Sequence, residues 1–206
     1  MLSIVFVANI VFPSGYLKGN KTEYYSLCGK QSGKVTVNYG LYTAVIDFSS
    51  SNEYYDLYSV INKKCRGKAD VYIINTMEAL NSLEKLAQRI SIKKVIVPEA
   101  FLKHMPTAER LNRLCCEIEE FSGKLNIKTG NMLLTSEGTY RYNIDKIRIK
   151  RKNKELVIHS SKHGAETGKH LNIFTYDNFR YMEFNNICIP ENVVNNQYEG
   201  IIIGTL

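Results

Sequence analysis

Hydrophobic and polar positions alternate with a period of two in the segment that follows Gly33. Lys34-Val-Thr-Val37 and Tyr42-Thr-Ala-Val-Ile-Asp47 both have this strand pattern. Between them, Asn38-Tyr-Gly-Leu41 contains Asn and Gly, which tolerate the positive φ angles of a tight turn. The pattern therefore predicts a β-hairpin over residues 34–47.

The middle of the chain alternates between strand and helix patterns. Polar residues at 47–52 precede a predicted helix over 53–64, and a β-branched strand over 71–74 leads into a second helix that ends at about Arg89. A strand over 94–97 and a third helix, from Pro106 to just before Gly123, follow. This alternation predicts a parallel or mixed sheet with helices packed on it. The inward positions of the three helices are Tyr54, Leu57, Tyr58 and Ile61, then Leu80, Leu83, Leu86 and Ala87, then Leu111, Leu114, Ile118 and Phe121.

Short strand patterns fill the rest of the chain, and Gly, Asn and Ser separate them. They predict a meander without further helices. The predicted strands are 125–128, 132–134, 139–142, 144–149, 156–159, 171–176, 180–184, 187–189 and 200–203.

The first twelve residues, Met1 to Phe12, are almost entirely apolar. They are too few to span a bilayer, which takes roughly 20 residues, and they lack the basic region of a signal peptide. Three interpretations stay open: a buried first element, the cut-off tail of a membrane helix, and an uncleaved targeting piece. We expect residues 1–20 to be an apolar start and linker, and residues 21–206 to form a single domain.

The composition is that of a globular protein with a basic balance. The chain has 206 residues, of which 44% are hydrophobic, and 27 Lys and Arg against 20 Asp and Glu give a formal net charge of +7. This charge suits an anionic partner such as DNA or a phospholipid surface, although a compositional bias toward Lys, Asn, Ile and Tyr explains it equally well. The five cysteines form no Cys-x-x-Cys pair and predict neither a disulfide framework nor a thiolate zinc site. Cys115 and Cys116 lie in the third helix pattern, where we expect small buried side chains.

Basic residues cluster in the segment 146–154. On a strand, Lys146, Arg148 and Lys150 share one face, and Arg151 follows them. Such a strip can neutralise DNA phosphates, but a solvated face that protects a sheet edge is the favoured interpretation. Two further lysines, Lys162 and Lys169, are candidates for phosphate contacts.

Fourteen tyrosines are present, and several stand next to each other. Aromatic rings among Lys and Arg can stack on exposed bases. The helical spacing of Tyr54 and Tyr58 instead favours packing against the core.

The order of elements over residues 24–100 resembles a known family. A hairpin that ends in Ile46-Asp47-Phe48-Ser49, then helix, strand, helix and Val95-Ile-Val-Pro98, resembles the metallo-β-lactamase-like domain at the C-terminal end of the ComEC/Rec2 DNA-internalisation proteins. Gly29-Lys-Gln-Ser-Gly33 resembles the glycine-containing turn that precedes the first strand of that domain. The resemblance implies an α/β fold of mixed β-sheets with flanking helices, an αββα sandwich that is complete or incomplete.

The chemistry of that family is missing from the matching positions. The family's histidine and aspartate ligands hold two metal ions, and Thr76, Glu78, Leu80 and Asn81 stand at four of those positions. Only Glu78 can bind a metal. The resemblance therefore implies no metal ligand set, no cofactor and no catalytic residue.

Three histidines lie within twelve residues: His159, His163 and His170. Lys162-His163-Gly164-Ala165 resembles the His-His-Gly-Ser turn found late in the family's domain. A metal would need further ligands, and only Glu166 is close in sequence, so a solvated polar loop is the favoured interpretation.

Our leading hypothesis is a non-enzymatic metallo-β-lactamase-like domain of a DNA-uptake membrane protein, with a structural or DNA-contacting role. The domain itself would be soluble and associated with a membrane, on either side, through the segment that precedes it. The alternative is a metal-dependent nuclease or other hydrolase of nucleic acid that uses Glu78, Asp47 and the histidine segment. A third possibility is an interaction module of a mobile element or phage.

Overall fold

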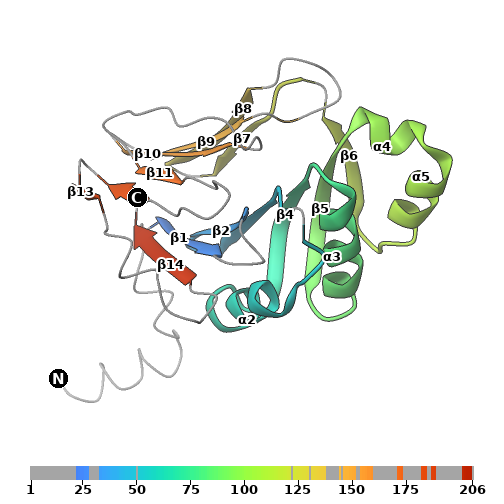
Figure 1. Ribbon diagram of the computed structural model, residues 1–206, viewed down its shortest axis with the longest axis horizontal. Coiled ribbons are helices and arrows are strands. Elements are labelled where there is room, and N and C mark those ends of the chain that lie inside the picture. Colours follow the sequence, from blue (N-terminus) through green and yellow to red (C-terminus); the bar gives the residue numbers. More distant parts are fainter. Residues whose placement is uncertain are drawn as a thin grey trace.

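The structure is a computed structural model, shown in Figure 1. It describes residues 22–27, 33–49, 51–121, 123–129, 131–137, 144, 146–151, 154–159, 171–173, 182–184, 187–188 and 201–205.

The first sheet has seven strands in the order β14-β1-β2-β3-β4-β5-β6. Strands β3 to β6 are parallel to one another, and β14, β1, β2 and β3 pair antiparallel. The sheet is therefore mixed, as predicted. The strands are β1 (Thr22–Leu27), β2 (Lys34–Tyr39), β3 (Tyr42–Asp47), β4 (Lys68–Ile74), β5 (Ser91–Pro98), β6 (Glu117–Phe121) and β14 (Ile201–Thr205).

Helices connect the parallel strands. Figure 1 shows α2 and α3 on one face of the first sheet, with α4 and α5 beyond its β6 edge. The Thr76 side chain caps α3 by accepting a hydrogen bond from the Ala79 amide at 3.1 Å. The helices are α2 (Tyr55–Lys64), α3 (Met77–Ala87), α4 (Glu99–Lys103) and α5 (Met105–Asn112).

The second sheet also has seven strands, in the order β13-β12-β11-β10-β9-β8-β7. Among the strand pairs that the structure describes in this sheet, only β10 and β11 are parallel. The sheet lies over the face of the first sheet that α2 and α3 leave open (Figure 1). The strands are β7 (Asn126–Thr129), β8 (Met132–Glu137), β9 (Lys146–Arg151), β10 (Lys154–His159), β11 (Leu171–Ile173), β12 (Met182–Phe184) and β13 (Ile187–Cys188).

Two hydrophobic cores hold these layers together. One core lies between the two sheets and joins Val35, Ile46 and Phe121 to Leu134 and Ile147. The other lies between the first sheet and the helices, with the inward faces of α2 and α3 against β3, β4 and β5. The middle strands are buried on both faces, which explains their continuous apolar sequences. The predicted mixed α/β sandwich is thus confirmed, with the described helices beside the first sheet.

One predicted helix is wrong in its second half. The helix expected from Pro106 to Gly123 ends at Asn112, and 117–121 forms β6 instead. Ile118 and Phe121 fit one face of a helix, but at a separation of three they also fit opposite faces of a strand. In the structure Phe121 lies in the core between the sheets, and Ile118 packs against the core on the helix side.

The same error misplaced the adjacent cysteines. Cys115 and Cys116 lie in the turn between α5 and β6, where Cys115 is exposed and Cys116 is half-buried. They are therefore not the buried helical side chains that the pattern predicted. Cys65, by contrast, is buried at the end of α2, and burial raises its pKa to about 12.

The predicted strand 139–142 and the apolar segment 1–12 lie outside the described residues. Among the residues that the structure describes, no helix is long and apolar enough to cross a membrane.

Candidate functional site

A buried lysine lies between the first sheet and α3. Lys34 begins β2 and pairs in register with Asp47, the last residue of β3. The Lys34 Nζ lies 2.7 Å from Asp47 Oδ2, and neither side chain is exposed to solvent. Lysine is almost never fully buried unless it is paired, so this ion pair is the most unusual electrostatic feature of the described chain.

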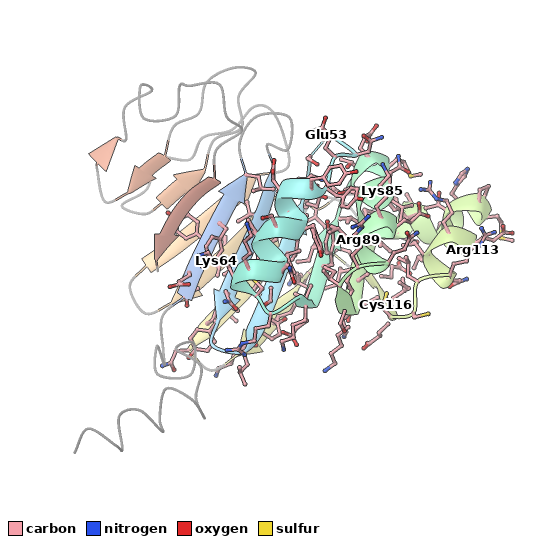
Figure 2. All side chains as sticks on the ribbon, turned by 90° about the horizontal axis from the view of Figure 1, so that it is seen from below. Glu53, Lys64, Lys85, Arg89, Arg113 and Cys116 are labelled. Carbon is pink, nitrogen blue, oxygen red and sulfur yellow. The ribbon has the colours of Figure 1, made fainter. Side chains whose placement is uncertain are left out.

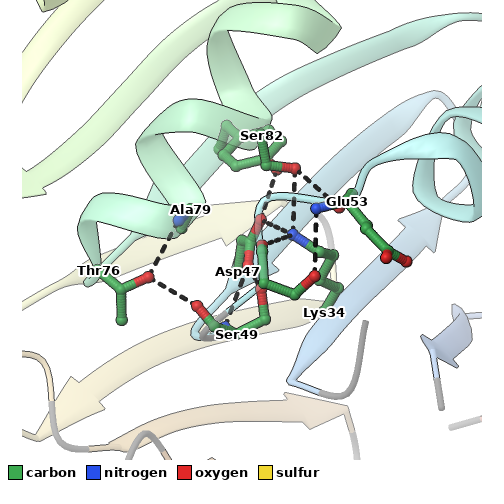
Figure 3. A network of polar contacts seen from close by, with 9 residues as sticks. Lys34, Asp47, Ser49, Glu53, Thr76, Ala79 and Ser82 are labelled. Carbon is green, nitrogen blue, oxygen red and sulfur yellow. Dashed lines mark hydrogen bonds and ion pairs between the residues drawn. The ribbon is translucent and has the colours of Figure 1, made fainter. Parts of the chain in front are cut away.

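All three ammonium donors of Lys34 have acceptors. Besides Asp47, the Nζ donates to the Ser82 Oγ of α3 at 3.1 Å and to the Ser51 carbonyl at 3.2 Å (Figure 3). The Ser82 hydroxyl in turn donates to the Glu53 carbonyl. Because an ammonium has three donors, no N–H of Lys34 is left for a ligand.

Both carboxylate oxygens of Asp47 also accept hydrogen bonds from other groups. Its Oδ1 accepts from the Ser49 amide at 3.1 Å and from the Ser49 hydroxyl at 2.7 Å. Its Oδ2 also accepts from the Tyr72 hydroxyl at 3.0 Å. Burial, followed by the negative charge of Asp47, raises the pKa of Tyr72 well above its usual value. The phenol therefore stays protonated and remains a donor to the carboxylate.

The backbone around this network is closely packed. Gly33 has a φ of +95°, and a Cβ at this position would lie 3.1 Å from the Ser49 nitrogen. The Thr76 hydroxyl donates to the Ser49 carbonyl at 2.7 Å, which ties the end of β3 to the start of α3. Hydrogen bonds within the fold thus hold together the residues that follow β3 and β4.

The four positions that correspond to metal ligands in the resembled family have other roles here. Thr76 is the N-cap of α3, Leu80 is fully buried in the core, and the Asn81 Oδ1 accepts a hydrogen bond from Arg110. Glu78 is exposed on the first turn of α3. These residues do not fit a metal site.

Two further carboxylates bear on metal binding. Asp47 is committed to Lys34, and Glu99, at the start of α4, contacts Lys103 through one oxygen. The other Glu99 oxygen is buried without a hydrogen-bond partner among the described residues. Within the described ranges, no three His, Cys, Asp or Glu side chains group closely enough to hold a metal.

The predicted basic strand has the expected alternation. Ile147 and Ile149 are fully buried between the sheets, whereas Arg148 is half-buried and Lys150 is exposed. Lys146 and Arg151 lie at the ends of β9, and only their backbone is described. Lys162, Lys169, His163 and His170 lie outside the described residues, and His159 ends β10.

The register adds detail that the sequence did not predict. Lys128 of β7 pairs with Leu133 of β8, which pairs with Lys150, so Lys128 belongs to the same row and is also exposed. Glu137 and Glu155 stand at the register positions opposite Lys146 and Lys150. The basic strip is therefore interrupted by acidic positions in its neighbouring strands.

Sequence reasoning missed the Lys34 network, although one signal was present. A hairpin closed by a two-residue turn at Gly40 and Leu41 pairs Tyr39 with Tyr42, and counting outward pairs Lys34 with Asp47. The opposite charges at this register position are the sequence signature of the buried pair. Their burial is decided by α3, which the register does not reveal.

Comparisons with known proteins concern the fold alone. No protein-family model matches the chain, and no curated protein matches it in sequence. The chain is similar in structure to the metallo-beta-lactamase fold protein YhfI from Bacillus subtilis, with a TM-score of 0.45 and 12% identity over 66% of this chain and 61% of that one. It is also similar to CmlA, a diiron beta-hydroxylase from Streptomyces venezuelae, with a TM-score of 0.44 and 12% identity over 69% of this chain and 30% of that one.

The chain spans less than two thirds of the length of each neighbour. Neither similarity concerns the ComEC/Rec2 family, and the resemblance to that family stays a prediction from the sequence.

Proposed function

We propose that this chain is a non-catalytic, metallo-β-lactamase-like domain of a DNA-uptake membrane protein, and that it contacts DNA through β9. The observation that carries the non-catalytic part is the Lys34–Asp47 pair, at 2.7 Å and fully buried. The Asp47 carboxylate at the end of β3 is therefore neutralised by a side chain of the chain itself, the Lys34 ammonium.

The DNA-contacting part rests on the second sheet. Lys128 and Lys150 are exposed in one cross-strand row, and Arg148 lies on the same face of β9 as Lys150. Cations spaced along a sheet face can contact successive phosphates without base recognition. Lys146, Arg151, Lys162 and Lys169 stay sequence-based candidates for further phosphate contacts.

Salt-dependent DNA binding tests the proposal. Fluorescence polarisation with a labelled 20-base-pair duplex should give a Kd that rises steeply with salt. For the double variant Arg148→Gln with Lys150→Gln, the slope of log affinity against log salt should fall by about 2, since each phosphate contact contributes about 0.9.

The matched control removes the same charge elsewhere. Arg113 and Lys124 are exposed at other places, and Arg113→Gln with Lys124→Gln should leave the slope nearly unchanged. Equal slopes for the two double variants would contradict a specific role of β9. Stoichiometric, tightly bound zinc or manganese in the purified protein would contradict the non-catalytic part.

A further inference from the structure

Aromatic and basic side chains meet on the helix layer, on the opposite side of the first sheet from the second sheet. Tyr54 and Tyr55 stand at the start of α2, and their ring centroids are 4.5 Å apart with an interplanar angle of 26°. Tyr54 is buried, whereas Tyr55 is 67% exposed. The buried ring thus supports the exposed one, and most of Tyr55 stays in solvent.

Two cations from α3 and the turn after it lie against this tyrosine pair. Arg89 lies over the Tyr54 ring at 5.8 Å and over the Tyr58 ring at 5.7 Å, measured from the guanidinium carbon to the ring centroids. Lys85 lies 5.8 Å from the Tyr54 centroid. Both cations are exposed, and Figure 2 shows them beside α2 on the helix-covered side.

Arg89 keeps its capacity to bind an anion. A cation–π contact uses the positive charge over the ring face and takes none of the N–H donors of the guanidinium. The same Arg89 can therefore be held by Tyr54 and Tyr58 and still donate to a phosphate. This arrangement fixes a flexible side chain before any ligand arrives, which lowers the entropy cost of binding.

Two acidic residues, Glu84 and Asp56, stand next to this cluster in the sequence. Glu84, next to Lys85 in sequence, receives two hydrogen bonds from Arg110 at 2.8 and 2.7 Å, and this contact lowers the pKa of Glu84. Its charge is therefore neutralised by α5. Asp56 in the first turn of α2 adds one negative charge, while Lys63 and Lys64 in the last turn add two exposed positive ones.

We propose that Tyr54, Tyr55, Tyr58, Lys85 and Arg89 form a binding surface for single-stranded DNA, in which a base stacks on Tyr55 and the flanking phosphates contact Lys85 and Arg89. A single-stranded ligand follows from the chemistry, because the flat face of a base is available for stacking only when the base is unpaired. The inference rests on the proposed function for the class of ligand, DNA, but it uses a different surface and a different form of DNA.

The test is fluorescence polarisation with a labelled 15-nucleotide poly-dT strand, an abasic strand of the same length, and a duplex. Tyr55→Ala should weaken poly-dT binding about tenfold, as expected for the loss of one base–aromatic stack. Tyr55→Phe keeps the ring and should stay within twofold of the wild type. The abasic strand should bind the wild type about as weakly as poly-dT binds Tyr55→Ala.

The results separate this inference from the proposed function. Tyr55→Ala should leave the duplex Kd unchanged, whereas the Arg148→Gln, Lys150→Gln variant should raise it. If Tyr55→Ala binds poly-dT as tightly as the wild type does, or the abasic strand binds as tightly as poly-dT, the inference is overturned and the duplex result still decides the role of β9. Duplex binding without any poly-dT binding would also overturn the inference alone.

Discussion

Strands β2 and β9 both carry lysine, but they place it in opposite environments. Lys34 of β2 is fully buried under α3 and neutralised by Asp47. Lys150 of β9 is exposed, and its neighbour Ile149 fills the core between the sheets. The difference follows from how many faces of each sheet are covered by other elements. The first sheet is covered on both faces, whereas β9 follows the alternation of a sheet with one face in the core.

The comparison explains why a charge pattern has different meanings in the two sheets. On β9, alternation sorts cations to the face that points away from the core between the sheets. On β2, a cation toward the helix layer needs an internal partner, because desolvation of an isolated ammonium is too costly. The Lys34 network is thus a structural element of the first sheet, and the binding surfaces proposed above lie outside it.

Removal of Lys34 should have the largest effect on stability. Lys34→Met leaves the Asp47 carboxylate buried without its counter-ion, and we expect a loss of about 3–5 kcal/mol in the free energy of unfolding. Chemical denaturation followed by circular dichroism measures this loss.

The double variant provides the control for this prediction. Lys34→Met with Asp47→Leu removes both charges, and it should be more stable than Lys34→Met alone, because a well-packed apolar pair can replace a buried ion pair. If the single variant loses less than about 1 kcal/mol, the pair does not carry the energetic role assigned to it here.

The sequence predicted the parts of the fold that depend on local pattern. The hairpin, β4, α3 and β5 have strong periodicity, and their positions are confirmed. Strand β1 was not predicted, and in the structure its Tyr24 and Tyr25 are buried on opposite faces of the sheet. β6 was taken for a helix because its apolar spacing fits both elements.

The candidate site depended on information that local pattern does not contain. The sequence predicts no metal ligands at Thr76, Leu80 and Asn81 from their side-chain chemistry, and the structure adds the contacts of two of them: Thr76 caps α3, and Asn81 accepts a hydrogen bond from Arg110. The hydrogen bond from Lys34 to Ser82 and the cation–π contact of Arg89 with Tyr54 each join elements that are far apart in sequence. Such contacts follow from the packing of α3 and its flanking turn on the sheet and on α2.

Neighbouring residues of β9 should differ sharply in their effect on stability. Ile149→Ala removes a fully buried side chain between the sheets and should cost about 2–4 kcal/mol, since it leaves a cavity. Lys150→Ala, one position further on, should change stability by less than about 0.5 kcal/mol. Urea denaturation of both variants measures the contrast. Similar losses for the two would show that β9 does not alternate between core and solvent.

A smaller and pH-dependent effect is expected for Tyr72, whose hydroxyl donates to Asp47 at 3.0 Å. Tyr72→Phe removes a hydrogen bond to a charged group and should cost about 1.5 kcal/mol at pH 8. The pKa of Tyr72 is raised in the folded state, so the phenol ionises first in the unfolded chain. Its stabilisation is complete below the usual tyrosine pKa of about 10 and is lost as the pH rises further, by about 1.4 kcal/mol per pH unit.

Since the phenylalanine variant lacks this titration, the stability difference between the wild type and Tyr72→Phe should shrink toward zero near pH 11. Denaturation at pH 8, 10 and 11 follows this difference, and other tyrosines titrate equally in both proteins. A difference that stays constant over this range would mean that Tyr72 is not held as a buried, protonated donor to Asp47. The contrast between the closed network under α3 and the solvated face of β9 would then lose its electrostatic basis.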